Sequence, residues 1–305
     1  MNKALLWIKA ARPQFFTATF VPIMLGAVIA WNHIGKFNWT LFWLTLIGGI
    51  FIHAGLNFGN DYYDDKSRND VVNKTPTPFS GGSRMIQKKI FTASEVRVAS
   101  LICFAIGSAI GLYLNFTLKG NVILILGIIG VFLAYFYTAP PIKLGYRKTS
   151  EVTVALGFGP IMLLGSYYVQ AERFSWGAFW TSLPIAILIA LVLCINEFPD
   201  YEADKTVGKN NMVVTLGKEK AIRHYRILLI LTYCLIASGV ILKVFPVFAL
   251  ITLLTLPWAL KAIRITMVHF NQVDELLPAN ALTVGIHFSF GLLFTLAYYL
   301  DGLIR

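Results

Sequence analysis

Long apolar runs recur along the whole chain and constrain its fold more than any other feature. A helix needs roughly 17–25 apolar residues to cross a hydrocarbon core about 30 Å thick. About nine runs approach or reach that length, near residues 14–31, 40–60, 99–117, 121–138, 152–170, 178–198, 227–242, 246–260 and 280–300. Hydrophobic residues fill 57% of the 305 positions and charged residues only 13%, which excludes an ordinary soluble domain. We expect an all-α, multi-pass membrane protein with about nine transmembrane helices in a bundle around a central cavity.

The basic residues fall almost entirely into alternate loops. With nine spans and a cytoplasmic N-terminus, only five of them lie outside, namely Lys36, Lys119, Arg173, Lys243 and Arg305. This arrangement satisfies the positive-inside rule, so the net charge of +11 reflects membrane topology. It gives no support to nucleic-acid binding and favours contact with anionic membrane lipids. No N-terminal stretch resembles a cleaved signal peptide, and we expect the first helix to be retained.

The acidic residues gather in two clusters that share a pattern. The first cluster, "NFGNDYYDDKSRND", covers residues 57–70, and the second, "NEFPDYEADKTVGKNN", covers residues 196–211. Four spans separate them, an even number, so both emerge on the cytoplasmic face. The repeated pattern suggests duplicated four-helix units at about 1–145 and 146–270, with a last helix near 280–300, inside one domain of residues 1–305.

The spacing of the acidic residues indicates a metal site. At 3.6 residues per turn, Asn57, Asp61 and Asp64 share one helix face, as do Asn196, Asp200 and Asp204 on another. Like charges stacked in this way repel each other, and a divalent cation removes the repulsion. Oxygen ligands favour Mg²⁺ or Mn²⁺, and Mg²⁺ commonly completes its shell with substrate phosphate oxygens. We therefore expect a phosphorylated substrate.

Basic and small residues near the clusters fit a phosphate group. Arginine and lysine pair well with phosphate, and the Gly81-Gly82 step would let backbone N–H groups approach it. The basic residues concerned are Arg84, Lys143, Arg147, Lys205 and Lys209. The cysteines lack the paired spacing of a zinc or disulfide site and are expected to be core residues, namely Cys103, Cys194 and Cys234.

Four stretches make the chain resemble the UbiA-type intramembrane prenyltransferases. They are "ARPQFFTATFVPIMLG", "GNDYYDD", "YTAPPIKLGYRKTSE" and "NEFPDYEADKTVGKNNMVVTLG". The form of both acidic motifs, together with "GGSRMI", is most similar to the menaquinone-pathway branch, which prenylates dihydroxynaphthoate. Branches acting on archaeal glyceryl phosphate lipids or hydroxybenzoate share the architecture, so the acceptor stays open between these classes.

The resemblance implies a Mg²⁺-dependent transfer of a prenyl group from a polyprenyl diphosphate to an aromatic or lipid acceptor. It implies two Mg²⁺ ions, held by Asn57, Asp61, Asp64 or Asp65, Asn196, Asp200 and Asp204. It places the diphosphate near Asn60, Arg84, Lys143, Arg147 and Lys205. Asp61, Asp200, Lys143 and Tyr137 are then the catalytic candidates, with Tyr62 and Tyr63 as further aromatic groups beside the prenyl cation.

Such a mechanism requires the two motifs to meet. Asp61 and Asp200 should face each other within about 10 Å at the cytoplasmic mouth, since metal–oxygen bonds are near 2.1 Å. Arg84 and Lys143 should lie above them, with an apolar slot for the prenyl chain below. A cation transporter is the rival interpretation, because buried carboxylates also mark ion pathways. It fits less well, since the middle of the spans and the outer face lack acidic residues.

Overall fold

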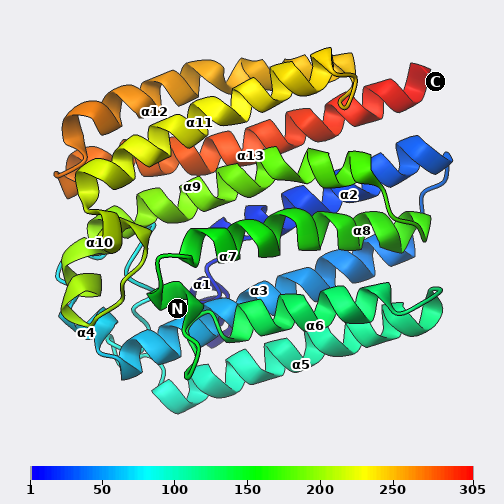
Figure 1. Cartoon of the computed structure of the whole chain (residues 1–305). Coiled ribbons are helices and arrows are strands. Elements are labelled where there is room, and N and C mark those ends of the chain that lie inside the picture. Colours follow the sequence, from blue (N-terminus) through cyan, green and yellow to red (C-terminus); the bar gives the residue numbers. More distant parts are fainter. Residues whose placement is uncertain (1, 305) are drawn as a thin grey trace.

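The protein is a bundle of long helices that lie side by side (Figure 1). The computed structural model describes residues 2–304, and these contain no strand. The elements are α1 (Lys3–Ala10), η1 (Pro13–Phe15), α2 (Thr17–Ile34), α3 (Trp39–Lys66), α4 (Asn69–Val72), α5 (Ala93–Thr117), α6 (Val122–Tyr135), η2 (Leu144–Tyr146), α7 (Ser150–Leu156), η3 (Gly157–Ile161), α8 (Met162–Ala171), α9 (Trp176–Thr206), α10 (Met212–Leu216), α11 (Lys218–Ile241), η4 (Val247–Thr255), α12 (Leu256–His269) and α13 (Val273–Ile304).

The predicted all-α membrane architecture is confirmed. Among the described residues, eight helices are long and apolar enough to cross a membrane, and α6 is a shorter apolar helix in the place of the fourth expected span. The predicted boundaries were too narrow in several places. For example, α9 continues to Thr206 instead of ending near 198, and α11 begins at Lys218 instead of near 227. An apolar run marks the part of a helix that lies within the membrane, whereas the helix itself continues beyond it with charged residues on it.

The extra length carries the acidic motifs to one end of the bundle. At 1.5 Å per residue, the 28 residues of α3 span about 42 Å, more than the hydrocarbon core of about 30 Å. The motifs occupy the last turns of α3 and α9, and α4 and α10 lie at the same end, on the left in Figure 1. We call this the motif end of the bundle.

Helix contacts divide the bundle into two neighbouring groups. α3 packs against α5, and α6 lies against α5, α3 and α8. On the other side, α13 contacts α2, α9, α12 and η4, and α11 packs against α9. A π-helical turn, η3, with Pro160 inside it, joins α7 to α8. Such turns are frequent at functional sites, and this one borders both cavities described below.

Close packing of α2 against α8 depends on Gly26. A Cβ at this position would collide with the carbonyl oxygen of Leu163 and would lie 3.1 Å from the backbone nitrogen of Tyr167. Small residues at helix crossings let two backbones approach each other in membrane proteins. Because the obstacle is backbone, it cannot rotate out of the way.

We therefore expect Gly26→Ala to destabilise the protein. Overpacking costs about 1–3 kcal/mol, so the melting temperature of the detergent-solubilised protein should fall by at least about 2 °C. Tryptophan fluorescence during heating would measure it. Gly111→Ala in α5 is the matched control, since a Cβ there meets nothing within 4 Å. Equal melting temperatures for the two variants would contradict this account of the α2–α8 contact.

Candidate active site

A polar cavity of 170 Å³ lies at the motif end, between α3 and α9. Many residues singled out in the sequence line it, namely Asn57, Asn60, Asp64, Gly81, Gly82, Tyr137, Asn196, Asp200, Asp204 and Lys209. Asp61 lies directly behind Gly82, where an added Cβ would be 3.1 Å from Asp61 Oδ1. The two acidic motifs, although more than a hundred residues apart in sequence, thus share one site.

A loop between α4 and α5 joins the two motifs. The backbone N–H of Gly81 donates to Asp200 Oδ2 at 3.0 Å, and the N–H of Ser83 donates to Asp61 Oδ1 at 3.2 Å. The Ser83 hydroxyl also donates to Asp61. Gly81 and Gly82 have φ values of +75° and +71°, a region that favours glycine. The Gly-Gly step therefore presents its backbone to the carboxylates of both helices.

Lys209, on the chain that follows α9, forms a second link between the motifs. Its Nζ lies 3.3 Å from Asp64 Oδ2 and 3.6 Å from Asp204 Oδ1. Asp204 also accepts hydrogen bonds from Asn69 at 2.8 Å and from Asn211 at 2.7 Å. The ammonium group neutralises part of the negative charge that the two motifs bring together.

Charge and burial shift the ionisation of groups around the cavity. Burial raises the pKa of Asp70 well above its ordinary value, and the negative charges of Asp64 and Asp61 add to the effect. Burial alone would lower the pKa of Lys209, but Asp204 and Asp64 outweigh it, so the pKa of Lys209 is raised. The site accordingly keeps a fixed cation at Lys209 and favours additional positive charge near Asp70.

Pro199 and Asn280 set the position of the second motif. Pro199 has no N–H and so leaves the carbonyl of Ile195, one turn earlier in α9, without its helical partner. The side-chain amide of Asn280, on α13, donates to that carbonyl at 3.0 Å and to Asn196 Oδ1 at 2.8 Å. α13 is thereby fastened to α9 one turn before Asp200. The amide oxygen of Asn196, predicted as a metal ligand, is used in this contact.

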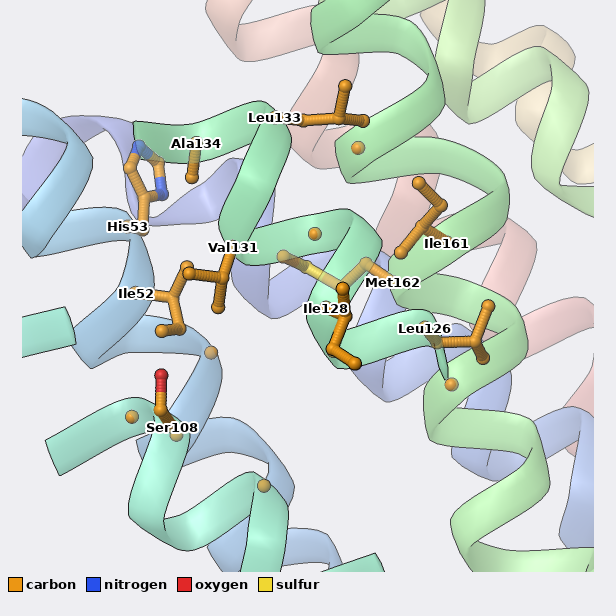
Figure 2. A pocket seen from close by; sticks show the side chains of 18 of the residues that line it. Ile52, His53, Ser108, Leu126, Ile128, Val131, Leu133, Ala134, Ile161 and Met162 are labelled. Atoms are coloured by element: carbon orange, nitrogen blue, oxygen red, sulfur yellow. The ribbon is translucent and has the colours of Figure 1, made fainter. Parts of the chain in front are cut away.

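An apolar groove of 580 Å³ extends from the polar cavity between α3, α5, α6 and α8. Figure 2 shows Ile52, Val131, Leu126, Ile161 and Met162 around it. The two cavities share their boundary residues His53, Leu56, Tyr137, Val154 and Phe158. The structure therefore joins a charged end to an apolar one.

Tyr137 stands at this junction because of a nearby glycine. A Cβ on Gly145 would lie 2.8 Å from two atoms of the Tyr137 ring, so only glycine allows the ring its place. The Gly145 N–H also donates to the Tyr137 carbonyl at 2.7 Å. Burial, with the charge of Glu197 second, raises the pKa of Tyr137 well above its ordinary value, which keeps the phenol neutral.

The donor set of the polar cavity fits a hard divalent cation. Its side-chain ligands are carboxylate and amide oxygens, the atoms that Mg²⁺ prefers. Four buried oxygens in its wall have no hydrogen-bond partner, namely Asn60 Oδ1, Asn69 Oδ1, Asp70 Oδ2 and Glu197 Oε2. Within residues 2–304, however, no three acidic, histidine or cysteine side chains are already arranged around one point. The carboxylates are instead engaged with Lys209 and the Gly-Gly loop, which a cation would have to displace.

Four basic residues predicted to bind diphosphate do not line the polar cavity. Arg84 donates to the backbone carbonyl of Asp70, and Lys143 lies 5.0 Å above the ring of Tyr146. Arg147 and Lys205 are exposed. Arg84 and Lys143 have left-handed backbone, with φ values of +63° and +50°, whereas Lys205 lies in the last turn of α9. Proximity in sequence to a motif did not determine their direction.

The structure also separates the two adjacent aspartates of the first motif. Asp64 faces the cavity and accepts a hydrogen bond from Tyr146 at 2.8 Å, whereas Asp65 accepts one from Gln87 at 3.1 Å outside it. Successive helical residues point about 100° apart, so only one of them can face the site. Tyr62 and Tyr63 stack edge to face with each other and do not line the cavity.

The sequence prediction missed several residues of the cavity wall. Arg12, in that wall, lies 3.6 Å from Asp61 Oδ1, and Asn73, behind it, donates to Asp200 Oδ1 at 2.7 Å. Glu197 and His287 also line the cavity. The signal for Arg12 was present in "ARPQ", a charge directly before the first span. No sequence signal placed His287, which lies in the middle of an apolar helix.

Comparison with known proteins agrees with this geometry. The chain is 28% identical over 300 residues to the 2-carboxy-1,4-naphthoquinone phytyltransferase of Synechocystis sp., covering 98% of this chain and 94% of that protein. It is 28% identical over 306 residues to the 1,4-dihydroxy-2-naphthoate octaprenyltransferase of Escherichia coli, covering 99% and 97%.

The fold is also found among solved structures. A UbiA homolog from Archaeoglobus fulgidus bound to GPP and Mg²⁺ is similar with a TM-score of 0.66 and 16% identity, over 95% of this chain and 99% of that chain. The UbiA prenyltransferase family matches residues 19–275, most of the chain. The chain is an integral, multi-pass membrane protein that belongs to the UbiA prenyltransferase family.

Proposed function

We propose that this protein transfers a prenyl group from a polyprenyl diphosphate to an aromatic quinone precursor inside the membrane. The junction of the polar cavity with the apolar groove carries the proposal, because a prenyl diphosphate has one charged and one apolar end. The names of the relatives, which specify naphthoquinone and dihydroxynaphthoate substrates, support an aromatic acceptor of that class. Positive-inside topology supports placing the motif end in the cytoplasm.

The polar cavity would hold the diphosphate. Arg12 and Lys209 are the cationic side chains in its wall, and the Gly81-Gly82 backbone lies between the two motifs. Asp61, Asp64, Asp200 and Asp204 would hold two Mg²⁺ ions with the amide oxygen of Asn60. Bound Mg²⁺ would supply Lewis-acid stabilisation of the leaving diphosphate.

The groove would hold the prenyl chain and keep water away from the reaction. The allylic C–O bond breaks with both electrons passing to the diphosphate oxygen, and a C–C bond then forms to an acceptor ring carbon, which loses its proton. Tyr137, 8% exposed, stands where the charged and apolar ends of the donor meet. Its neutral aromatic ring would stabilise the developing allylic cation by cation–π attraction.

Purified protein should transfer a geranyl group from geranyl diphosphate to 1,4-dihydroxy-2-naphthoate when Mg²⁺ is present. EDTA should abolish the transfer and added Mg²⁺ restore it, because oxygen ligands bind the metal reversibly. Mass spectrometry of the products measures it, with hydroxybenzoate and a glyceryl phosphate lipid as competing acceptors. Transfer only to hydroxybenzoate or only to the lipid would mean that the acceptor belongs to that class instead. If the correctly folded protein transfers the geranyl group to none of the three acceptors, the proposed function is wrong.

Asp64→Asn should lower kcat by at least about 100-fold, whereas Asp65→Asn should stay within about threefold of wild type. Asp64 faces the polar cavity and Asp65 faces Gln87, so only the first removes charge from the metal site. The two changes are chemically identical and adjacent, which makes each the control for the other. Steady-state rates at saturating Mg²⁺ measure the difference. A larger loss of kcat in Asp65→Asn than in Asp64→Asn would assign the metal ligand to Asp65 instead.

Lys209→Met should raise the KM for prenyl diphosphate about tenfold or more, because it removes a cation from the cavity wall. Lys205→Met, four residues earlier, is the control and should leave that KM within about twofold, since Lys205 is exposed. Rates at varied geranyl diphosphate and saturating acceptor measure both. Similar effects in the two variants would remove Lys209 from the proposed diphosphate site.

A further inference from the structure

Two buried histidines line the polar cavity, and they differ in one respect. His53, on α3, is paired through Nδ1 with the hydroxyl of Thr19 at 2.8 Å. His287, on α13, is 1% exposed, and its Nε2 has no hydrogen-bond partner. A buried polar atom without a partner costs about 1–3 kcal/mol. His53 is therefore tied to α2 through Nδ1, whereas the buried Nε2 of His287 is an unused bonding position.

His287 belongs to a part of the cavity wall that the apolar groove does not share. We use the name α13 lobe for six residues of that unshared wall, from α2, α9 and α13, namely Thr17, Ala18, Ile189, Val192, Val284 and His287. Ala18, Ile189, Val192 and Val284 pack together in one cluster with Val154 and Phe158. The lobe is thus apolar apart from Thr17 and the His287 ring.

The groove and the α13 lobe are walled by different helices. The groove extends between α3, α5, α6 and α8, while the lobe is walled by α2, α9 and α13. Phe158 and Val154 border the groove and pack against the lobe. A donor whose chain occupies the groove would leave the lobe open to a second, flat and mostly apolar molecule beside the reacting carbon.

We propose that the acceptor ring binds in the α13 lobe and that His287 Nε2 hydrogen-bonds an oxygen substituent of that ring. The inference rests on the proposed function, since it concerns the second substrate of that reaction. An apolar surface with one polar group matches an aromatic ring that carries a hydroxyl or carboxylate oxygen. His287 is then the residue that recognises the acceptor, and it takes no part in binding diphosphate.

The test is a comparison of His287→Leu, His287→Gln and wild type by steady-state kinetics. His287→Leu should raise the KM for the naphthoate acceptor about tenfold or more, while the KM for geranyl diphosphate stays within about twofold. His287→Gln should recover most of the affinity, because its amide reaches the position of Nε2. His269→Leu is the matched control, since His269, at the end of α12, hydrogen-bonds Gln272 and does not line the cavity.

A second substitution keeps the test decisive if His287→Leu does not fold. Val284→Phe, one turn before His287, fills the lobe and should raise the KM for the acceptor without changing that for the donor. An acceptor KM within twofold of wild type in folded His287→Leu overturns the inference, as does an unchanged KM in Val284→Phe. Failure of the proposed function looks different, because wild type itself would then transfer no prenyl group.

Acceptor analogues identify the oxygen involved. A naphthoate without hydroxyl groups and a naphthalenediol without the carboxylate would each be compared, as inhibitors that compete with the acceptor, in wild type and His287→Leu. The analogue that lacks the recognised oxygen should lose affinity for wild type and show no further loss in the variant. Equal further losses for both analogues would contradict a contact between His287 and either oxygen.

Discussion

Negative charge brought to one end of an apolar bundle is the constraint on which the rest of this structure depends. Asp61, Asp64, Asp200 and Asp204 converge there from α3 and α9, where they would repel one another. Lys209 and the loop around Gly81 and Gly82 donate to these carboxylates and offset the repulsion. The contacts with the carboxylates in turn hold the loop in its path. The path of the loop and the proposed substrate site thus depend on the same cluster of negative charge.

Helix packing within the membrane holds the two acidic motifs in position relative to each other. Close contact at Gly26 brings α2 onto α8, and Asn280 ties α13 to α9 through the carbonyl that Pro199 leaves free. Lipid offers no hydrogen bonds, so the free carbonyl must be satisfied within the protein, as it is by Asn280. The second motif is consequently fixed by helices on both of its sides, and its carboxylates meet those of the first motif at a set position.

The structure separates a charged environment from an apolar one. Charged groups act at the motif end, while the groove and the α13 lobe are lined almost wholly by apolar side chains. Tyr137 lies on the boundary, where a reacting carbon would be shielded from water yet remain close to the diphosphate. Separate apolar walls for donor and acceptor would let the two substrates bind side by side without competing for one surface.

The sequence by itself determined the all-α membrane fold, the positions of nine apolar helices and the two acidic motifs, because these depend on local runs and helical period. It also placed Asp61 and Asp64 on one face of their helix, and Asp200 and Asp204 on one face of theirs. Only the tertiary structure decided which other side chains join them. Arg84 and Lys143 lie near the motifs in sequence but turn away, whereas His287 comes from a helix some eighty residues further on. Such neighbours are set by helix packing and loop path, which no local pattern encodes.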